Sequence, residues 1–475
     1  MCNTSCDHNT LSFASSTHAT EAGYCRPTAQ RRTAAISPQG VSLTTKRTKT
    51  VDDLTDDSSS FPAPLVLPND ELSLDPRCPP QSMRAWIRSK DRNKVTPAKS
   101  TIYVASPPGV DSDVELIRTW NRPSTRYGYN EAICPPETRD IIDYLGAFYD
   151  GMAVKLLPFP LSFVAWNTPA SRVPRREAQE SLRYIGLTTS TECIRIRTRQ
   201  SADKIFTRQL NLDDLLDAAI SMLPEDAYAL LMLVDHDLFE SEDDAFVCGR
   251  AYGGSRVAVI STARYNPVLD SVQNVERQHA WPTSHCKYYL QECCAATSRS
   301  PARNRGQRAS NNATSNRNTC STSFLPVVAD DCLEQGSSSA LQAAVAAHKA
   351  LPSLDASSSA TTLAGLWRGR VCRTASHELG HCFGIEHCVY YACVMQGSSS
   401  LSEDARQPPY LCPVDLAKLL TATGSSAKQR YSMLLRFCEN HEDTHLFAAF
   451  TAWIRVRLKA LKAVHVEDHG TPPEQ

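Results

Sequence analysis

One segment constrains this chain more than any other: His377-Glu378-Leu379-Gly380-His381, followed by Gly384 and His387. Two histidines four residues apart lie on one face of a helix, one turn from each other, so both imidazoles can bind one metal ion at about 2.0–2.1 Å. A third ligand to that ion has to come from outside the helix. Gly384 lets the chain leave the helix because it has no Cβ, and His387 is then predicted to be the third ligand.

Glu378 lies next to the first of these histidines and is predicted to reach a water molecule on the metal. There it would act as general base, taking the proton of the water during attack on a carbonyl group. Zinc suits three imidazoles and one water in a tetrahedral arrangement, so the segment predicts a catalytic zinc site. The alternative is a helix whose histidines are only packed or solvated. The added glycine and third histidine make a chance match roughly a thousandfold rarer than the bare histidine pair.

Residues 377–395 resemble the metzincin clan, whose pattern HExxHxxGxxH is followed by a methionine turn. Met395, eight residues after His387, matches that turn. In the clan this methionine forms an apolar floor beneath the metal without binding it. The resemblance implies an α+β, metzincin-like zincin fold, with a twisted mixed sheet, an active-site helix and a helical C-terminal part. It also implies zinc-dependent hydrolysis of peptide bonds, with peptides or proteins as substrates.

Past His387 the chain resembles the archaemetzincin family, in which four cysteines bind a second, structural zinc. Cys388, Cys393 and Cys412 match three of them, and Asp415 stands where the family usually has the fourth. Aspartate is a permitted zinc ligand. Three outcomes therefore stay open: Asp415 completes the second site, another residue does, or the site is weak or empty. Buried thiols without any metal are the alternative interpretation of the cysteines.

The likeness to the family is looser over residues 225–270, where hydrophobic runs predict strands before the active helix. Apolar and β-branched patterns predict strands at 101–105, 154–157, 161–166, 193–197, 227–234 and 256–261. Apolar residues at helical spacing predict helices at 140–149, 212–223, 341–351, 362–383, 414–422, 427–439 and 443–463, with Asn211 as a cap.

Two regions are expected to lack fixed structure. Residues 1–99 begin with a stretch rich in serine, threonine and charge that cannot bury enough apolar surface, so they are predicted to be a disordered, low-complexity region. Residues 100–475 are predicted to form the metallopeptidase domain. A disordered insertion is expected within it at about 295–360, because residues 295–324 are mostly serine, asparagine and arginine.

The charge and hydropathy of the chain exclude several classes of partner. Its 50 basic and 51 acidic residues give a net charge of −1, which favours neither nucleic acid nor an anionic membrane. No run approaches the roughly 20 apolar residues that a membrane helix needs, and the N-terminus does not resemble a secretory signal. We therefore expect an intracellular protein, cytoplasmic or nuclear, whose 18 cysteines are metal ligands or buried thiols rather than disulfides.

Other patterns are weaker candidates. His441 and His445 form a second HExxH without the glycine and third histidine, which favours a surface helix pair. Asp75-Pro76-Arg77-Cys78 resembles the cysteine-switch propeptide of secreted matrix metalloproteases, but no signal peptide is evident and prolines follow, so Cys78 is interpreted as an ordinary loop cysteine. His236 is expected in a turn, and Tyr265 is a candidate for the border of the cleft. The competing function is a zinc-stabilised binding or scaffold protein with little turnover, although a structural site has no need of Glu378.

Overall fold

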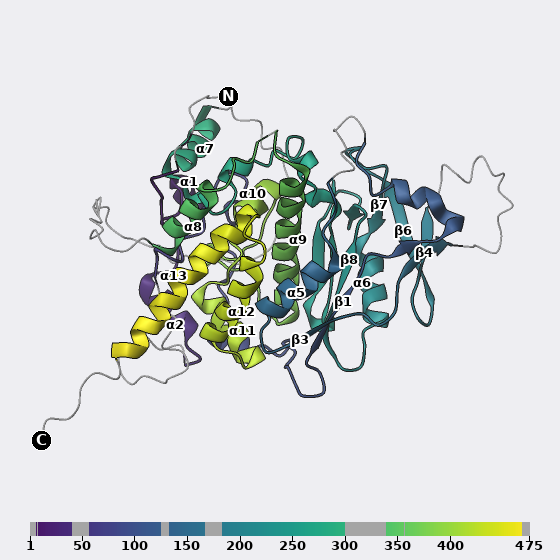
Figure 1. Ribbon diagram of the computed structural model, residues 1–475, viewed down its shortest axis with the longest axis horizontal. Helices are drawn as coiled ribbons and strands as arrows, with labels where there is room; N and C mark the ends of the chain where they lie inside the picture. The colour runs from purple at the N-terminus through teal and green to yellow at the C-terminus, as the bar shows by residue number, and fades with distance from the viewer. Residues whose placement is uncertain are drawn as a thin grey trace, which may run out of the picture.

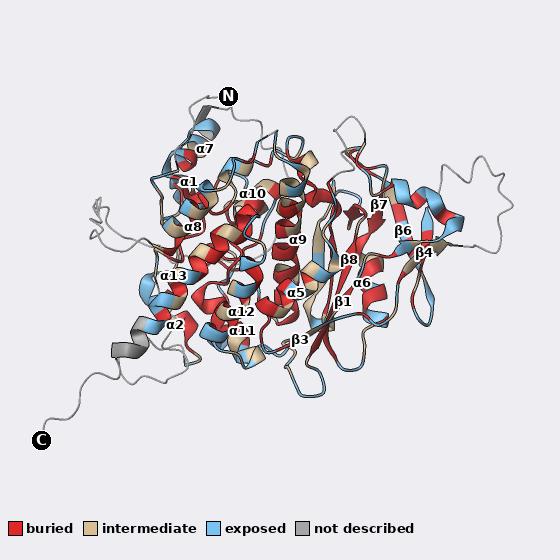
Figure 2. Cartoon of the chain, viewed as in Figure 1, coloured by how far each residue is buried: buried red, intermediate tan, exposed pale blue. Residues whose placement is uncertain are grey.

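The computed structural model describes residues 6, 8–39, 57–124, 133–166, 183–299, 339–355 and 357–467. It has an α+β fold, as the sequence predicts. A long helix, α9 (Ala360–Cys382), runs between a group of C-terminal helices and two β-sheets (Figure 1). Figure 2 shows α9 and the strand β8 (Ala227–Val234) mostly in the colour of buried residues, so the core lies on both sides of this helix.

The first sheet has five strands in the order β10-β11-β8-β1-β3. Strands β3 (Ala153–Leu156), β1 (Thr101–Ala105), β8 and β11 (Val257–Ser261) are parallel. Strand β10 (Gly249–Tyr252) is antiparallel to β11 and lies at the edge of the sheet. Every residue of β8 is buried, as expected for a central strand that is covered on both faces.

The second sheet has six strands in the order β2-β4-β5-β6-β7-β9. They are β2 (Gly109–Val110), β4 (Ser162–Ala165), β5 (Tyr184–Thr188), β6 (Cys193–Gln200), β7 (Arg208–Asn211) and β9 (Leu238–Phe239). Helix α6 (Leu212–Ser221) packs on strands of both sheets. Its cap is the predicted one, because the Asn211 side chain accepts a hydrogen bond from the Asp214 N–H at 3.1 Å.

The C-terminal helices cover the side of α9 that faces away from the second sheet (Figure 1). Helix α13 (His445–Glu467) packs on α9, on α8 (Ala340–Lys349) and on α12 (Ala427–Glu439). Helix α5 (Thr138–Phe148) packs on α9 and α12. Helices α10 (Leu401–Arg406) and α11 (Pro413–Thr423) complete this part. All the strands and helices predicted above are present, with ends that differ by a few residues.

The N-terminal region differs from the prediction of disorder over residues 1–99. Its described parts hold four short helices: α1 (Thr17–Ala22), α2 (Ala29–Ile36), α3 (Glu71–Leu74) and α4 (Met83–Arg88). Phe61 and Trp86 are fully buried, and the ring of Phe61 lies 5.5 Å from those of Tyr410 and Trp453. The composition argument assumed that this region needs a core of its own. Instead its apolar side chains are buried against distant parts of the chain, among them the C-terminal helices.

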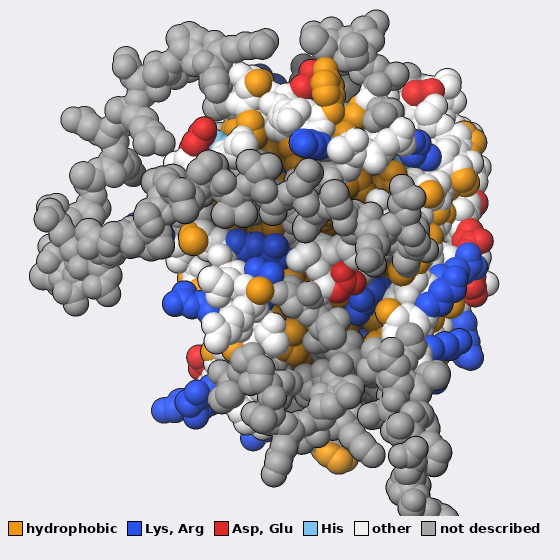
Figure 3. All heavy atoms as spheres, turned by 90° about the vertical axis from the view of Figure 1, so that its left-hand side faces the viewer, with side chains coloured by type: hydrophobic (Ala, Val, Ile, Leu, Met, Phe, Trp, Pro, Cys, Tyr) orange, Lys and Arg blue, Asp and Glu red, His pale blue; other side chains and the backbone are white. Residues whose placement is uncertain are grey.

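The expected insertion at 295–360 falls mainly on residues 300–338, which lie outside the described residues. Its two ends are helical, in α7 (Lys287–Arg299) and α8, so the expected bounds were too wide. Among the described residues, none of the helices is both long enough and apolar enough to cross a membrane. On the face shown in Figure 3, basic side chains are scattered among apolar and polar ones where the described residues are visible.

Candidate metal centre

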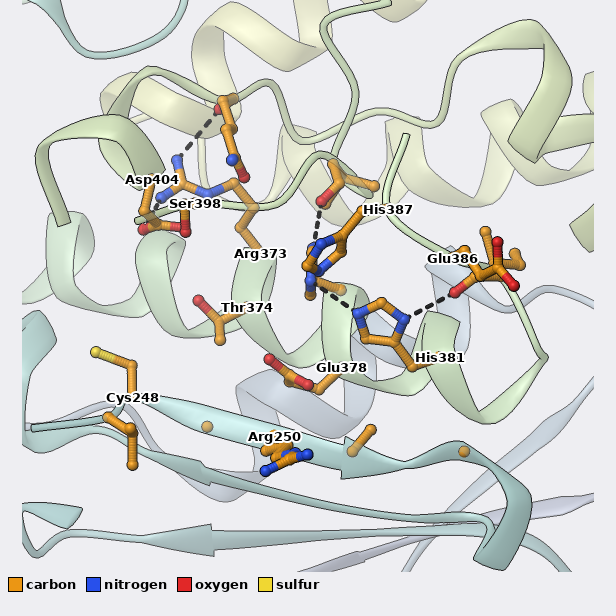
Figure 4. A pocket seen from close by; sticks show the side chains of 18 of the residues that line it. Cys248, Arg250, Arg373, Thr374, Glu378, His381, Glu386, His387, Ser398 and Asp404 are labelled. Atoms are coloured by element: carbon orange, nitrogen blue, oxygen red, sulfur yellow. Dashed lines mark hydrogen bonds and ion pairs between the residues drawn. The ribbon is translucent and has the colours of Figure 1, made fainter. Parts of the chain in front are cut away.

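The three predicted histidines come together at the C-terminal end of α9. The helix ends at Cys382, and Gly384 takes a left-handed conformation with φ +72° that turns the chain back. This turn brings His387 next to His377 and His381, so that each offers a ligand atom within 4.8 Å of the others. In Figure 4, His381 and Glu378 project from α9 into the pocket and His387 approaches from the returning chain.

Each ring is oriented by a hydrogen bond at its outer nitrogen. Nδ1 lies 2.7 Å from the Val394 carbonyl oxygen in His377, and 2.7 Å from the Ile385 carbonyl oxygen in His381. In His387, Nδ1 lies 2.8 Å from a carboxylate oxygen of Glu71. A carbonyl can only accept, so Nδ1 carries the hydrogen in His377 and His381. In the neutral rings Nε2 then carries no hydrogen and presents a lone pair.

This geometry fits a metal cation. Nε2 of His377 and Nε2 of His381 lie 3.1 Å apart, and two lone pairs at that distance repel unless a positive charge lies between them. Burial lowers the pKa of His377 to about 3 and that of His381 well below its usual range, so neither ring supplies this charge itself. Converging imidazole nitrogens, each oriented by an acceptor behind it, are a donor set suited to zinc.

Glu378 lies on α9 between the first two histidines and lines the same pocket. Its carboxyl is half-buried, and burial raises its pKa to about 7, although His387 and Arg250 oppose this shift. A cation held by the histidines would favour the charged carboxylate still further. With a cation bound, Glu378 would be a carboxylate at neutral pH, which is the form that accepts a proton as a general base.

The pocket around these residues has a volume of about 840 Å³. One wall is the edge strand β10 with Cys248 just before it and Arg250 within it, and the other is α9 with the loop at Ser398 (Figure 4). At one end Arg373 and Asp404 form an ion pair at 2.5 Å. Tyr265, a sequence candidate for the cleft border, does line the pocket.

Met395 lies under this site, fully buried. A Cβ added at Gly380 would come within 2.4 Å of its sulfur, so the glycine on α9 allows the methionine to pack directly against the helix between the two histidines. Met395 also accepts a hydrogen bond from the Cys388 N–H at 2.7 Å. It therefore ties the first cluster to the second.

The second cluster consists of Cys388, Cys393, Cys412 and Asp415, all buried, with ligand atoms within 4.8 Å of one another. An Asp415 oxygen lies 3.4 Å from the sulfur of Cys393 and 3.3 Å from that of Cys412. The structure thus places Asp415 beside the three cysteines, where an oxygen of its carboxylate is within reach of an ion that they would hold. The other Asp415 oxygen accepts a hydrogen bond from buried Lys418 at 2.8 Å.

Three residues of the N-terminal region support the turn that carries His387. Glu71 contacts His387 itself. Gln81 donates to the Gly384 carbonyl at 2.9 Å and accepts from the Glu386 N–H at 3.2 Å. Trp86 donates to the Phe383 carbonyl at 2.8 Å. Sequence reasoning missed all three, because no local pattern marks a glutamate more than 300 positions away as the partner of a histidine.

The weaker sequence candidates lie elsewhere. His236 is buried against Phe163, and its Nε2 lies 3.1 Å from the Ile117 carbonyl oxygen. His445 lies 2.8 Å from the Pro352 carbonyl oxygen. Among the described residues, neither of these, nor His441, nor Cys78, belongs to a metal-ligand group or lines the pocket.

Comparison with known proteins shows that the part of the chain with these residues is similar to a peptidase family. Residues 347–420 match the model of peptidase family M54. Over 74 residues the chain is 46% identical to archaemetzincin-2 of Homo sapiens, which covers 16% of this chain and 21% of that protein. Over 63 residues it is 41% identical to archaemetzincin-1 of Homo sapiens, covering 13% of each. The match spans about a fifth or less of the length of these relatives.

Among solved structures, archaemetzincin from Methanopyrus kandleri aligns with 70% of this chain and 99% of that one, at 15% identity and a TM-score of 0.29. The protein from Archaeoglobus fulgidus aligns with 67% and 99%, at 15% identity and a TM-score of 0.27. The resemblance to the archaemetzincin family is confirmed by these sequence matches, and the family model covers both clusters of candidate ligands.

Proposed function

We propose that this chain is a zinc-dependent metallopeptidase, with His377, His381 and His387 as ligands of a catalytic zinc. The observation that supports this most is that the Nε2 atoms of His377 and His381 lie 3.1 Å apart. In both rings Nδ1 already donates to a main-chain carbonyl, so both Nε2 atoms carry a lone pair. The match to a peptidase family over residues 347–420 points to the same chemistry. Substrates are then peptides or proteins.

Zinc bound here would supply an activated water and polarise the scissile carbonyl. Glu378 accepts the proton of the attacking water and delivers it to the leaving amine. The acceptors at Val394, Ile385 and Glu71 keep the three rings fixed while this happens. Met395 is the apolar floor beneath the site, and Gly384 provides the turn that returns His387.

The edge strand β10 gives the substrate a place to bind. It pairs with β11 on one side only among the described strands, and residues 249–251 line the pocket. An extended peptide can add to this edge through main-chain hydrogen bonds, which places its scissile bond between β10 and α9. We therefore propose that α9 is the active helix beneath a mixed sheet, in the metzincin-like fold that the sequence resemblance implies.

We also propose a second, structural zinc held by Cys388, Cys393, Cys412 and Asp415. Four ligands without an open position are typical of structural zinc. The site ties the loop after His387 to the start of α11, so metal binding there would add to the stability of the fold. The expected absence of nucleic-acid and membrane partners, and an intracellular location, stay predictions.

The test compares zinc-loaded protein with its Glu378→Ala variant on a diverse peptide library, with cleavage read by mass spectrometry and zinc measured in both. The variant keeps all three histidine ligands and loses only the base. Cuts made by the native protein and absent with the variant would support the proposal. If neither protein cleaves any peptide although both contain zinc, the proposal is overturned in favour of a zinc-stabilised binding protein.

A further inference from the structure

A third group of metal-ligand side chains lies outside the two clusters described above. Cys6, His8 and His279 each offer one ligand atom, these atoms lie within 4.8 Å of one another, and all three side chains are half-buried. None of them lines the pocket around Glu378. His279 ends the 3₁₀ turn η6 (Arg277–His279), which precedes α7, the helix next to α1 at the upper left of Figure 1.

Backbone pairing brings these distant parts of the chain together. Leu11 and Cys286 form an antiparallel bridge. The Ser12 N–H donates to the His285 carbonyl at 2.8 Å, and the Lys287 N–H donates to the Thr10 carbonyl at 2.9 Å. This short ladder fixes the register of residues 10–12 against residues 285–287, and it brings the segment with Cys6 and His8 into the neighbourhood of His279.

His279 has the geometry of a metal ligand. Its Nδ1 lies 3.0 Å from a carboxylate oxygen of Glu276, so the hydrogen is on Nδ1 and Nε2 is a bare acceptor. That Nε2 is buried and has no hydrogen-bond partner among the described residues. The ring cannot turn easily, because it stacks on Tyr289 at 4.0 Å and meets the ring of His8 edge-on at 5.1 Å.

The candidate catalytic site has the same arrangement, in which the Glu71 carboxylate forms a hydrogen bond with the outer nitrogen of His387. A carboxylate behind a histidine fixes the tautomer and makes the other nitrogen a better ligand. A buried acceptor without a donor is otherwise unfavourable in a folded protein. At His279, a cation in contact with Nε2 satisfies this atom.

We propose that Cys6, His8 and His279 bind a further Zn²⁺ ion, independent of the peptidase site. One thiolate and two imidazoles are a ligand set that zinc accepts in tetrahedral sites. Cys6 and His279 also line a pocket of about 770 Å³, which leaves the fourth position accessible. The ion would fasten the N-terminal segment to the loop that precedes α7.

A disulfide is the competing arrangement for Cys6. Its sulfur lies 2.9 Å from that of Cys286, and no disulfide joins the two in the structure. Oxidation to a Cys6–Cys286 disulfide would take the thiolate away from the metal. The experiment must therefore separate zinc binding from oxidation.

The test measures zinc per chain by plasma mass spectrometry in the full-length protein, purified with a thiol reductant. Cys6→Ser and His279→Gln should each contain one zinc fewer than the native protein. Cys134→Ser and His441→Gln, which change an exposed cysteine and a histidine outside every ligand group, should contain as much as the native protein. Circular dichroism checks that each variant is folded.

Cobalt substitution gives a second readout. Native protein loaded with Co²⁺, minus the His279→Gln variant loaded in the same way, should leave a visible d–d spectrum with a thiolate charge-transfer band. Equal metal content in all five proteins with no difference spectrum would overturn the proposal. So would a Cys6–Cys286 disulfide in a non-reducing peptide map together with unchanged zinc in His279→Gln.

Discussion

At the scale of single residues, the candidate catalytic site depends on atoms that face away from the metal. The three imidazoles converge because each outer nitrogen has its own acceptor, two of them main-chain carbonyls and one the carboxylate of Glu71. Glu71 is also fixed, since its backbone N–H donates to Glu403 at 2.9 Å. We therefore expect Glu71, which is outside the proposed ligand set, to control how well His387 binds zinc.

Replacing Glu71 tests this directly. Glu71→Ala should weaken zinc binding at the histidine site by about 10- to 100-fold, because His387 loses the partner that orients its ring. Zinc affinity is measured by competition with a chelator of known affinity. Glu71→Gln, which keeps an acceptor oxygen, should recover part of the loss, and Glu115→Gln, on an exposed 3₁₀ segment, should change nothing. Unchanged affinity in Glu71→Ala would remove the positioning role.

Asp415 has two possible reasons to be buried, and one pair of variants separates them. It contacts the cysteine cluster with one oxygen and Lys418 with the other. Asp415→Ala should destabilise the protein by about 3–5 kcal/mol, because buried Lys418 loses its counter-charge. The double variant Asp415→Ala/Lys418→Met should lose less stability than Asp415→Ala, because it leaves no unpaired charge at position 418.

The proposed second zinc predicts a further difference between the double variant and the native protein, in their response to a chelator. If Asp415 is a ligand, adding a chelator should lower the melting temperature of the double variant less than that of the native protein. The same chelator shift in both proteins would show that Asp415 serves only as the partner of Lys418.

At the scale of elements, the junction between α9 and the following turn positions the site. Sequence spacing predicts this junction well: the helix, the turn at Gly384 and the return of His387 all follow from a local pattern. Strands such as β8 and β11 were equally predictable from their apolar runs. Helix α10 and strand β5 were not, because α10 is short and β5 is placed by its partners β4 and β6 rather than by its own composition.

Gly384 tests the importance of that turn. Gly384→Ala should cost about 1–2 kcal/mol of stability, because φ is +72° and the new Cβ would lie 3.2 Å from the side chain of Arg92. The same strain should weaken zinc binding at His387. Chemical denaturation measures the first effect and chelator competition the second.

Gly146→Ala on α5 is the matched control, since nothing lies within 4 Å of its added Cβ and the helix should gain up to about 1 kcal/mol. Equal stability of Gly384→Ala and the native protein would mean that the turn tolerates a side chain.

At the scale of the whole molecule, the N-terminal region is part of the folded core and of the candidate site. Phe61 and Trp86 belong to the same hydrophobic core as Ile102 on β1 and Leu379 on α9. Composition could not reveal this, because burial against distant helices leaves no local periodicity. The same reason explains why Glu71 and Gln81 were missed while the histidines were found.

Stability should also depend on pH through His236. Burial lowers its pKa to about 4 from an ordinary value near 6.5. The folded state therefore resists protonation that the unfolded chain accepts, so this contribution is present above about pH 6.5 and is lost as the pH falls toward 4. Between pH 7 and pH 4 the loss amounts to about 3 kcal/mol.

The measurement compares the free energy of unfolding of the native protein and of His236→Gln across this pH range. The effects of acid on the metal ligands are common to both proteins and cancel in the difference. The native protein should lose more stability than the variant as the pH falls. Parallel curves would mean that His236 titrates normally in the folded state.

The central claim is that zinc on three histidines and the base Glu378 together cleave peptide bonds. The most direct test is the rate of peptide cleavage after the metal is removed with a chelator and zinc is added back, in the native protein and in Glu378→Gln. We predict that the native protein loses its activity and regains it with zinc. Glu378→Gln should bind zinc equally but stay about 10²- to 10⁴-fold slower. Activity that survives metal removal, or a Glu378→Gln variant as fast as the native protein, would contradict the account.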